Sequence, residues 1–135
     1  MVSVFKIREA TAVWTNPEGG FWDDPANWDG TLPGTNDDVF IDVPGDVTVT
    51  HRSGNTTIRS LRVKNPFVLS GGNLVVTDVI EVDGSFTLNN GATLRNARIV
   101  AGPSGGVLIV TSGTLDRVTV NSDLDLSGDG AVVAT

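Results

Sequence analysis

The sequence lacks several residue types, and each absence removes a class of chemistry. It has no cysteine, which excludes disulfides, zinc–thiolate sites and thiol nucleophiles. It has one histidine, which leaves a single candidate imidazole base. No stretch has the roughly 18 consecutive apolar residues of a membrane-spanning helix, and none shows sustained helical spacing of apolar residues. The first residues, MVSVFKIR, also lack the hydrophobic core of a signal peptide, so an export signal is expected outside this chain.

What the sequence does contain is a repeat of about twenty residues, running from Val47 to the end. Each unit has a short apolar-x-apolar strand, a polar turn with glycine, and a second apolar strand. The first strands align at residues 47–49, 67–69, 86–88, 108–110 and 124–126. A repeat of this kind indicates one supersecondary unit stacked on copies of itself.

The second strand of each unit follows the pattern apolar-x-x-apolar-x-apolar, seen at residues 58–63, 94–99 and 115–120. In the copy that begins at Val76 and Val79, the third apolar position holds Glu81, so we expect a bulge that turns Val82 inward. The intervening residues are polar, as in strands with one buried face. The unit is too short for a propeller blade, and the pattern favours an all-β fold: a short right-handed β-helix of about five coils. Phe67 and Phe86 would then be stacked neighbours, whereas the alternative, a β-sandwich, would separate them.

The first third of the chain does not follow the repeat and is interpreted as an N-terminal cap. We expect one continuous domain, with the cap over residues 1–46 and the coils over 47–135. Trp14, Trp22 and Trp28 lie close together among Pro, Gly and Asp, and such a cluster can cover the open end of a β column. The alternative is a sugar-stacking platform formed by exposed Trp22 and Trp28. Because the chain stops in an apolar stretch at 131–135, we expect it to be part of a longer polypeptide, with open coil ends that can self-associate.

Charge is concentrated in the same region. Residues 1–50 contain nine acidic and two basic side chains, whereas the remainder is balanced, so the net charge of −7 belongs to the first third. This distribution disfavours nucleic acid and anionic membranes as partners of that end.

Two sequence stretches give the chain a family resemblance. They are GGFWDDPANWDGTLPGTNDDVFIDVPGDVTVT and TTIRSLRVKNPFVLSGGNLVV, within residues 14–76. Trp22 and Trp28 precede a Pro-Gly turn and the acidic pair Asp37-Asp38, which leads into a V-x-I strand. This arrangement resembles the N-terminal segment of large bacterial cell-surface β-helix proteins of the adhesin or autotransporter kind. It is also similar to the extracellular eight-glycine β-repeat domain.

The resemblance implies an exported module at the cell surface or in the extracellular matrix, often within proteins that adhere to or process polysaccharide. No catalytic residue belongs to the pattern. We therefore expect a non-enzymatic structural or adhesive module of an extracellular bacterial surface protein. The alternatives are a carbohydrate-binding module for an anionic polysaccharide and a non-catalytic fragment of a polysaccharide-degrading β-helix enzyme.

The repeat alignment predicts a basic surface. It stacks four arginines on one outer face, in two columns with a spacing of roughly 10 Å between same-column residues two coils apart. Guanidinium groups bind carboxylate and sulfate in bidentate fashion, so the face is a candidate site for an anionic polysaccharide or cell-surface glycan. The four residues are Arg59, Arg62, Arg95 and Arg98. Pairing with nearby acids is the alternative role for these side chains.

Other polar residues give weaker indications of a site. His51 is interpreted as an exposed turn residue, and the acids Asp78, Glu81 and Asp83 as solubilising side chains. Asp37, Asp38 and Asp42 form an oxygen-rich group near the cap. The Ca²⁺ candidates are Asp123, Asp125 and Asp129, where the first half of a calcium loop is matched but its twelfth position holds Ala134 in place of Glu. No cofactor is therefore expected, with Ca²⁺ as the alternative.

Overall fold

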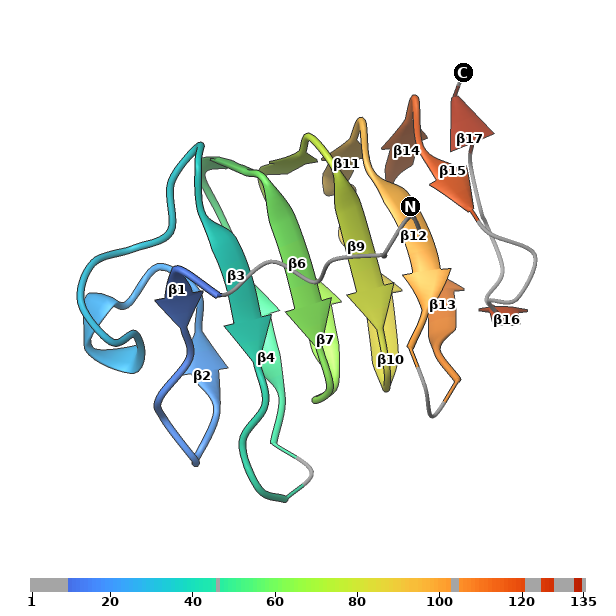
Figure 1. Cartoon of the computed structure of the whole chain (residues 1–135). Helices are drawn as coiled ribbons and strands as arrows, with labels where there is room; N and C mark the ends of the chain where they lie inside the picture. The colour runs from blue at the N-terminus through green and yellow to red at the C-terminus, as the bar shows by residue number, and fades with distance from the viewer. Residues whose placement is uncertain (1–9, 46, 103–104, 121–124, 128–132, 135) are drawn as a thin grey trace, which may run out of the picture.

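The computed structural model describes residues 10–45, 47–102, 105–120, 125–127 and 133–134, which form a β-solenoid (Figure 1). The chain winds through three parallel sheets in turn, so that each set of three successive strands makes one coil. Four complete coils are followed by the strands of a fifth, and a Trp-rich cluster covers the first coil. The predicted all-β solenoid with its Trp-rich cluster is confirmed. Within the described residues, no helix has the length and apolar character needed to cross a membrane.

The three sheets are named here by the order in which a coil visits them. The first sheet contains β1 (Ala12–Val13), β3 (Asp38–Ile41), β6 (Ser60–Val63), β9 (Val79–Val82), β12 (Arg98–Ala101) and β15 (Thr119–Val120). The second contains β2 (Gly20–Phe21), β4 (Val49–His51), β7 (Phe67–Leu69), β10 (Ser85–Leu88), β13 (Val107–Val110) and β16 (Asp125–Ser127). The third contains β5 (Asn55–Ile58), β8 (Asn73–Val76), β11 (Thr93–Arg95), β14 (Thr114–Asp116) and β17 (Val133–Ala134).

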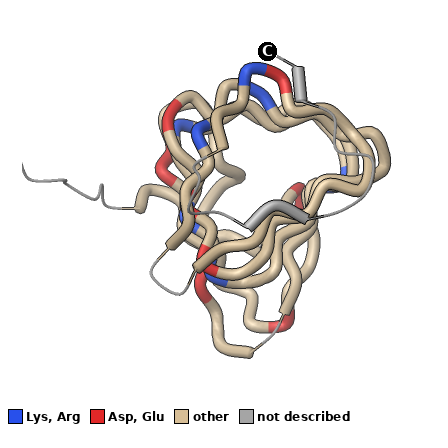
Figure 2. The backbone as a smooth tube through the Cα atoms, turned by 90° about the vertical axis from the view of Figure 1, so that its right-hand side faces the viewer, with Lys and Arg blue, Asp and Glu red and all other residues tan. Residues whose placement is uncertain are grey.

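Stacked apolar side chains fill the interior of the coils. Because strand residues alternate between the two faces, every second side chain points inward and lies directly on its counterpart in the next coil. Phe67 and Phe86 stack in this way, with ring centroids 5.1 Å apart. Viewed along the stack, the coils superpose into one closed outline, and the positions of Lys, Arg, Asp and Glu are spread around it (Figure 2). One inward column runs through the first sheet as Val39, Leu61, Ile80, Ile99 and Val120.

The cap follows the solenoid geometry for two of its three sides. β1 pairs with β3 and β2 pairs with β4, both in parallel, so the cap extends the first and second sheets. The third side contains the 3-10 helix η1 (Pro25–Asn27) and the connection to β3. Asp24 caps η1 by accepting a 3.0 Å hydrogen bond from the Ala26 N–H. The described residues of the cap therefore contribute no strand to the third sheet.

Three details of the sequence prediction are wrong. The first ladder position of β4 is Val49, which pairs with Phe67, so the expected strand at 47–49 lies two residues too early. The expected strand at 124–126 has the same error, because Leu126 pairs with Leu108. The coils also begin at β3, inside the segment 1–46 that was expected to be cap alone.

The expected bulge at Glu81 is correct in part. Val82 does turn inward and is fully buried. However, Ile80 is the preceding inward residue, and Val79, predicted to be inward, is only half-buried. The corner before β9 accommodates one more residue than its counterparts, because Leu74 to Ile80 spans six positions whereas Leu94 to Ile99 spans five.

Candidate functional site

The three tryptophans form the packed centre of the cap. Trp14, Trp22 and Trp28 are 1%, 3% and 4% exposed. The Trp28 ring packs edge-on against Trp14 at 5.1 Å and against Trp22 at 4.9 Å. The indole N–H of Trp28 donates to the Trp22 carbonyl at 2.9 Å, which satisfies its only polar atom. Trp22 and Trp28 are therefore not an exposed sugar-stacking platform, and their burial agrees with the capping role.

The predicted columns, Arg59 with Arg95 and Arg62 with Arg98, do not form. Arg62 lies beside Glu81 in the ladder, and Arg98 lies beside Val79, so these two arginines are in different columns. Arg95 pairs in register with Val75 and Asp116, not with Arg59. The reason is that the same sequence pattern occurs with two different corners. Thr56 and Leu94 occupy the same ladder position, and the chain turns at Asn96, two residues after Leu94, with a φ of 66°. In the first coil the corner comes later, after Ile58.

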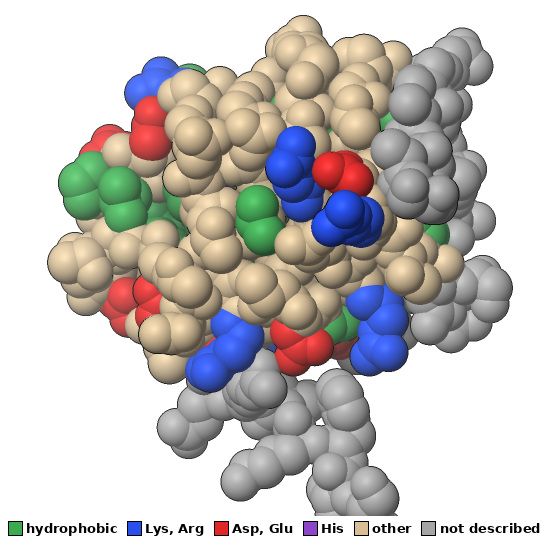
Figure 3. Space-filling model, turned by 90° about the horizontal axis from the view of Figure 1, so that it is seen from above, with side chains coloured by type: hydrophobic (Ala, Val, Ile, Leu, Met, Phe, Trp, Pro, Cys, Tyr) green, Lys and Arg blue, Asp and Glu red, His purple; other side chains and the backbone are tan. Residues whose placement is uncertain are grey.

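Three of the four arginines are held by carboxylates. Arg59 binds Asp38, which is 4% exposed and also accepts a 2.6 Å hydrogen bond from the Ser60 hydroxyl. The hydrogen bond from the Arg59 guanidinium to the Asp38 carboxylate raises the pKa of Arg59 above its ordinary value. Arg62 pairs with Glu81 at 3.2 Å, and Arg95 with Asp116 at 3.3 Å. Seen from above in Figure 3, basic and acidic side chains lie beside one another, without a continuous basic strip.

The acidic candidates for metal binding are not assembled into a site in the described part of the chain. No group of three or more His, Asp or Glu side chains with metal-binding geometry occurs among those residues. Asp123 and Asp129 lie outside the described residues, and Asp125 is described only as part of β16. Asp37 accepts hydrogen bonds from the Thr11 hydroxyl and the Gly34 N–H, so it organises the loop before β3.

His51 is buried at 1% exposure, which corrects its interpretation as an exposed turn residue. The two-residue shift of β4 places it on an inward position beside Leu69. Its Nδ1 lies 3.0 Å from the Gly71 carbonyl oxygen and its Nε2 lies 2.9 Å from the Thr56 hydroxyl. Burial lowers the pKa of His51 from 6.5, against a smaller opposing effect of the Gly71 hydrogen bond.

These two hydrogen bonds determine which imidazole nitrogen of His51 donates and which accepts. A carbonyl only accepts, so Nδ1 carries the proton and donates to Gly71. Nε2 is then an acceptor, and the Thr56 hydroxyl donates to it. The Thr56 oxygen keeps lone pairs that can accept one further hydrogen bond.

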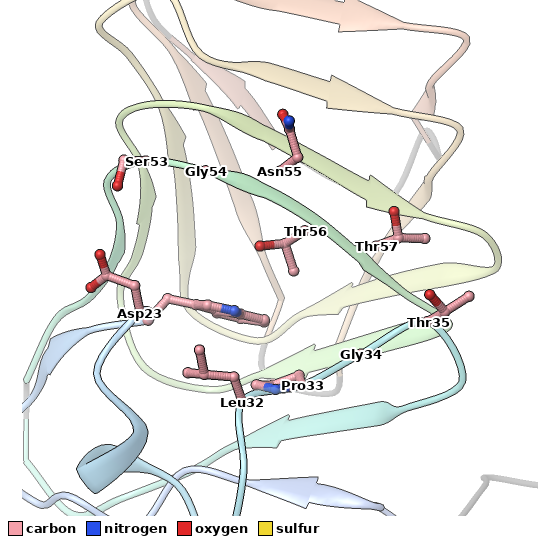
Figure 4. Close-up of a pocket in the computed structure, with 11 residues that line it drawn as sticks. Asp23, Leu32, Pro33, Gly34, Thr35, Ser53, Gly54, Asn55, Thr56 and Thr57 are labelled. Atoms are coloured by element: carbon pink, nitrogen blue, oxygen red, sulfur yellow. The ribbon is translucent and has the colours of Figure 1, made fainter.

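A pocket of about 440 Å³ opens beside Thr56, between the cap and the first coil (Figure 4). One wall is β5 with the turn before it, and the opposite wall is the segment 32–35, with Trp22 and Asp23 closing one end. Figure 4 shows the Thr56 side chain directed beneath β5 toward Pro33 and Leu32, whereas Asn55 and Thr57 point away. Leu32 is 41% exposed, so the pocket has one accessible apolar wall.

The pocket was not predicted from the sequence, although a signal for it exists. Thr56 occupies the inward column that continues as Leu74, Leu94 and Leu115. His51 occupies the column of Leu69, Leu88 and Val110. Two adjacent aliphatic columns thus become polar in the first coil, where the pocket opens. A correct alignment of the first unit would have shown this exchange.

The comparisons with known proteins identify no relative: no family model, curated protein or solved structure matches this chain.

Proposed function

We propose that this chain is a non-catalytic structural or adhesive module of an extracellular bacterial surface protein, with the coils acting as a rigid spacer. The observation that supports this role is the unbroken parallel pairing of each sheet from the cap side to the last described strands. Coils that pair in this way rise by about 4.8 Å each, and each contacts mainly its neighbours. Such a column holds what lies at its two ends at a fixed separation.

The distribution of polar groups supports the non-catalytic part of the proposal. In the described region, Arg59, Arg62 and Arg95 form ion pairs with acids of neighbouring strands. His51, the only imidazole, is buried between Gly71 and Thr56. These groups are engaged in holding coils together, as expected of a scaffold.

A distance measurement tests the spacer role. Because the chain has no cysteine, spin labels can be attached at Glu18→Cys in the cap and at Arg98→Cys in the fourth coil after it. We expect a narrow distribution of label distances that broadens only when urea unfolds the chain. A broad distribution in native buffer would contradict a rigid spacer. In parallel, the unlabelled chain is incubated with neutral, uronate and sulfated polysaccharides, and new reducing ends would contradict a non-catalytic module.

The anionic-polysaccharide alternative has less support, because three of its four arginines already have carboxylate partners. Binding of sulfated polysaccharide at low salt that is lost in Arg98→Ala would favour it over the spacer.

A further inference from the structure

Among the described strands, the third sheet has one fewer than the other two. The first and second sheets have six strands each, because the cap supplies β1 and β2, whereas the third sheet has five and ends at β5. The pocket described above lies along the outer edge of β5, the last strand of this sheet on the cap side. It therefore occupies the place where a cap strand of the third sheet would lie.

In the part of the chain that the structure describes, the edge of β5 that faces the pocket has backbone groups without a partner. In a β-strand, the N–H and C=O groups of successive residues point to opposite sides. The carbonyls of Gly54 and Ile58 accept from Asn73 and Thr77, so these two carbonyls face β8. Asn55 and Thr57 must then direct their N–H and C=O groups toward the cap.

The same alternation continues at Arg59, whose N–H donates to the Asp37 carbonyl of the cap at 2.9 Å. No described residue makes a backbone hydrogen bond of this kind to the cap side of Asn55 or Thr57. Two donors and two acceptors are therefore presented to the pocket in ladder geometry. An unpaired edge of this kind is a template for another strand.

We infer that this pocket binds an extended peptide of a partner protein, which adds to β5 as the sixth strand of the third sheet. The backbone of the peptide pairs with Asn55 and Thr57, and we expect a parallel orientation because β5 pairs in parallel with β8, as do the other named strands of the described sheets. The free backbone groups favour a peptide over other ligands, since a peptide strand carries donors and acceptors at the same alternating spacing.

The walls of the pocket define the side chains that such a peptide needs. Its inward side chain lies on Thr56, whose oxygen accepts a hydrogen bond, and beside the apolar Leu32. A Ser or Thr supplies the donor and a methyl or methylene group together. Among the described residues that line the pocket, Asp23 carries the one charge, and its carboxylate is paired with Arg52 at 3.2 Å. The first third of the chain is acidic overall, so a neutral or basic peptide is favoured over an acidic one.

The test uses four acetylated and amidated hexapeptides of sequence KVXVTK, with Ser, Thr, Val or Leu at X, titrated into the intact chain. Binding is followed by the amide signals of Asn55 and Thr57 in NMR and by their hydrogen exchange. We expect saturable binding at micromolar to millimolar concentrations, tightest for Ser or Thr, with slower exchange at both amides. The absence of binding by all four peptides at millimolar concentration would overturn the inference.

Two N-methylated versions of the best peptide give a control that leaves the protein unchanged. One is methylated on the odd residues and the other on the even residues, so each loses the N–H groups of one edge. Only one edge of an added strand pairs with β5, so one version should bind about tenfold more weakly or worse, while the other binds as before. Equal binding of both versions would rule out strand addition.

A protein-side control compares the two exposed large apolar residues of the cap. Leu32, 41% exposed, lines the pocket, whereas Phe21, 42% exposed, does not. Leu32→Lys should weaken peptide binding about tenfold, and Phe21→Lys, which adds the same charge, should not. Equal effects of the two substitutions, or displacement of the peptide by a cello-oligosaccharide that binds more tightly, would contradict a peptide site. These outcomes are independent of the label distances that test the spacer.

Discussion

At the scale of single residues, the polar pair in the first coil is the clearest departure from a plain aliphatic interior. His51 and Thr56 replace residues of the kind found at Leu69 and Leu74 in the next coil. Each hydrogen-bonding atom of the imidazole has a partner, so the exchange leaves no unsatisfied group in the neutral form. The cost appears when the imidazole gains a proton, because burial disfavours the charged form.

We therefore predict that stability depends on the protonation of His51. Its pKa is lowered in the folded chain, so the unfolded chain binds more protons in the window below about pH 6.5. The contribution of His51 to stability is complete above this value and is lost as the pH falls toward the folded-state pKa. The free energy of unfolding should fall by at most about 1.4 kcal/mol per pH unit there.

Urea unfolding at a series of pH values between about 5 and 8 measures this effect. The double variant His51→Leu/Thr56→Leu serves as the control, since it restores both columns and removes the titrating group. Its stability should be nearly flat across the same window. A slope that persists in the double variant would assign the effect to other groups.

At the scale of elements, the turns between the second and third sheets decide how closely coils approach. Gly72 and Gly91 occupy two successive turns of this kind, with φ values of 71° and 74°. A Cβ on Gly72 would lie 2.2 Å from the Gly54 carbonyl oxygen of the previous coil, whereas a Cβ on Gly91 would meet no atom within 4 Å. The two positions have the same left-handed backbone conformation and differ only in the room available for a Cβ atom.

We predict that Gly91→Ala costs about 1–2 kcal/mol, the penalty for a left-handed alanine. Gly72→Ala should cost clearly more, because the turn must also move away from Gly54 and disturb the pairing of β5 with β8. Chemical denaturation of the two variants gives the comparison directly. Equal losses would mean that the coils have room to separate at this turn.

At the scale of the whole molecule, the cap and the coils form one apolar core. The Trp22 ring contacts Phe67 at a centroid distance of 5.8 Å, and Phe67 stacks on Phe86, so aromatic packing continues from the cap into the second and third coils. In a stacked architecture, each unit is stabilised chiefly by its neighbours. Loss of the cap should then weaken the coils as well.

We predict that Trp28→Ala lowers the free energy of unfolding by about 3–5 kcal/mol, the usual cost of removing a buried large ring. The loss should appear in circular dichroism, which reports on the strands of the coils, and not only in tryptophan fluorescence. Phe21→Ala is the matched control, since this ring is exposed and contacts Arg52 at its surface. An unchanged circular dichroism midpoint for Trp28→Ala would show that the coils are stable without the cap.

Much of this architecture could be predicted from the sequence, because the inward residues of a stacked repeat are apolar and recur at regular positions. The alternation around Phe67 and Phe86 was sufficient for the solenoid. The register of the first coil could not be predicted, since Val47 and Val49 both fit an apolar-x-apolar strand. This ambiguity of two residues hid the inward position of His51.

The prediction of an arginine face was wrong for a related reason. A sequence pattern does not show where a corner lies relative to the ladder, and the left-handed turn at Asn96 differs from the corner before Leu61. A correct alignment of the repeat would show that two columns become polar at His51 and Thr56, but it would not show the pocket itself, which arises where the described part of the cap adds no strand to the third sheet. An omission of this kind has no counterpart in the sequence of the coils.

Coil length varies without loss of register: Phe67, Phe86 and Leu108 share one column although their spacings are 19 and 22 residues. The additional residues of the longer coil fall between β12 and β13, outside the paired strands. A connection between two paired strands can thus differ in length from coil to coil while the ladder positions stay the same. We therefore expect that a foreign epitope grafted between β12 and β13 would leave the register of the neighbouring strands unchanged.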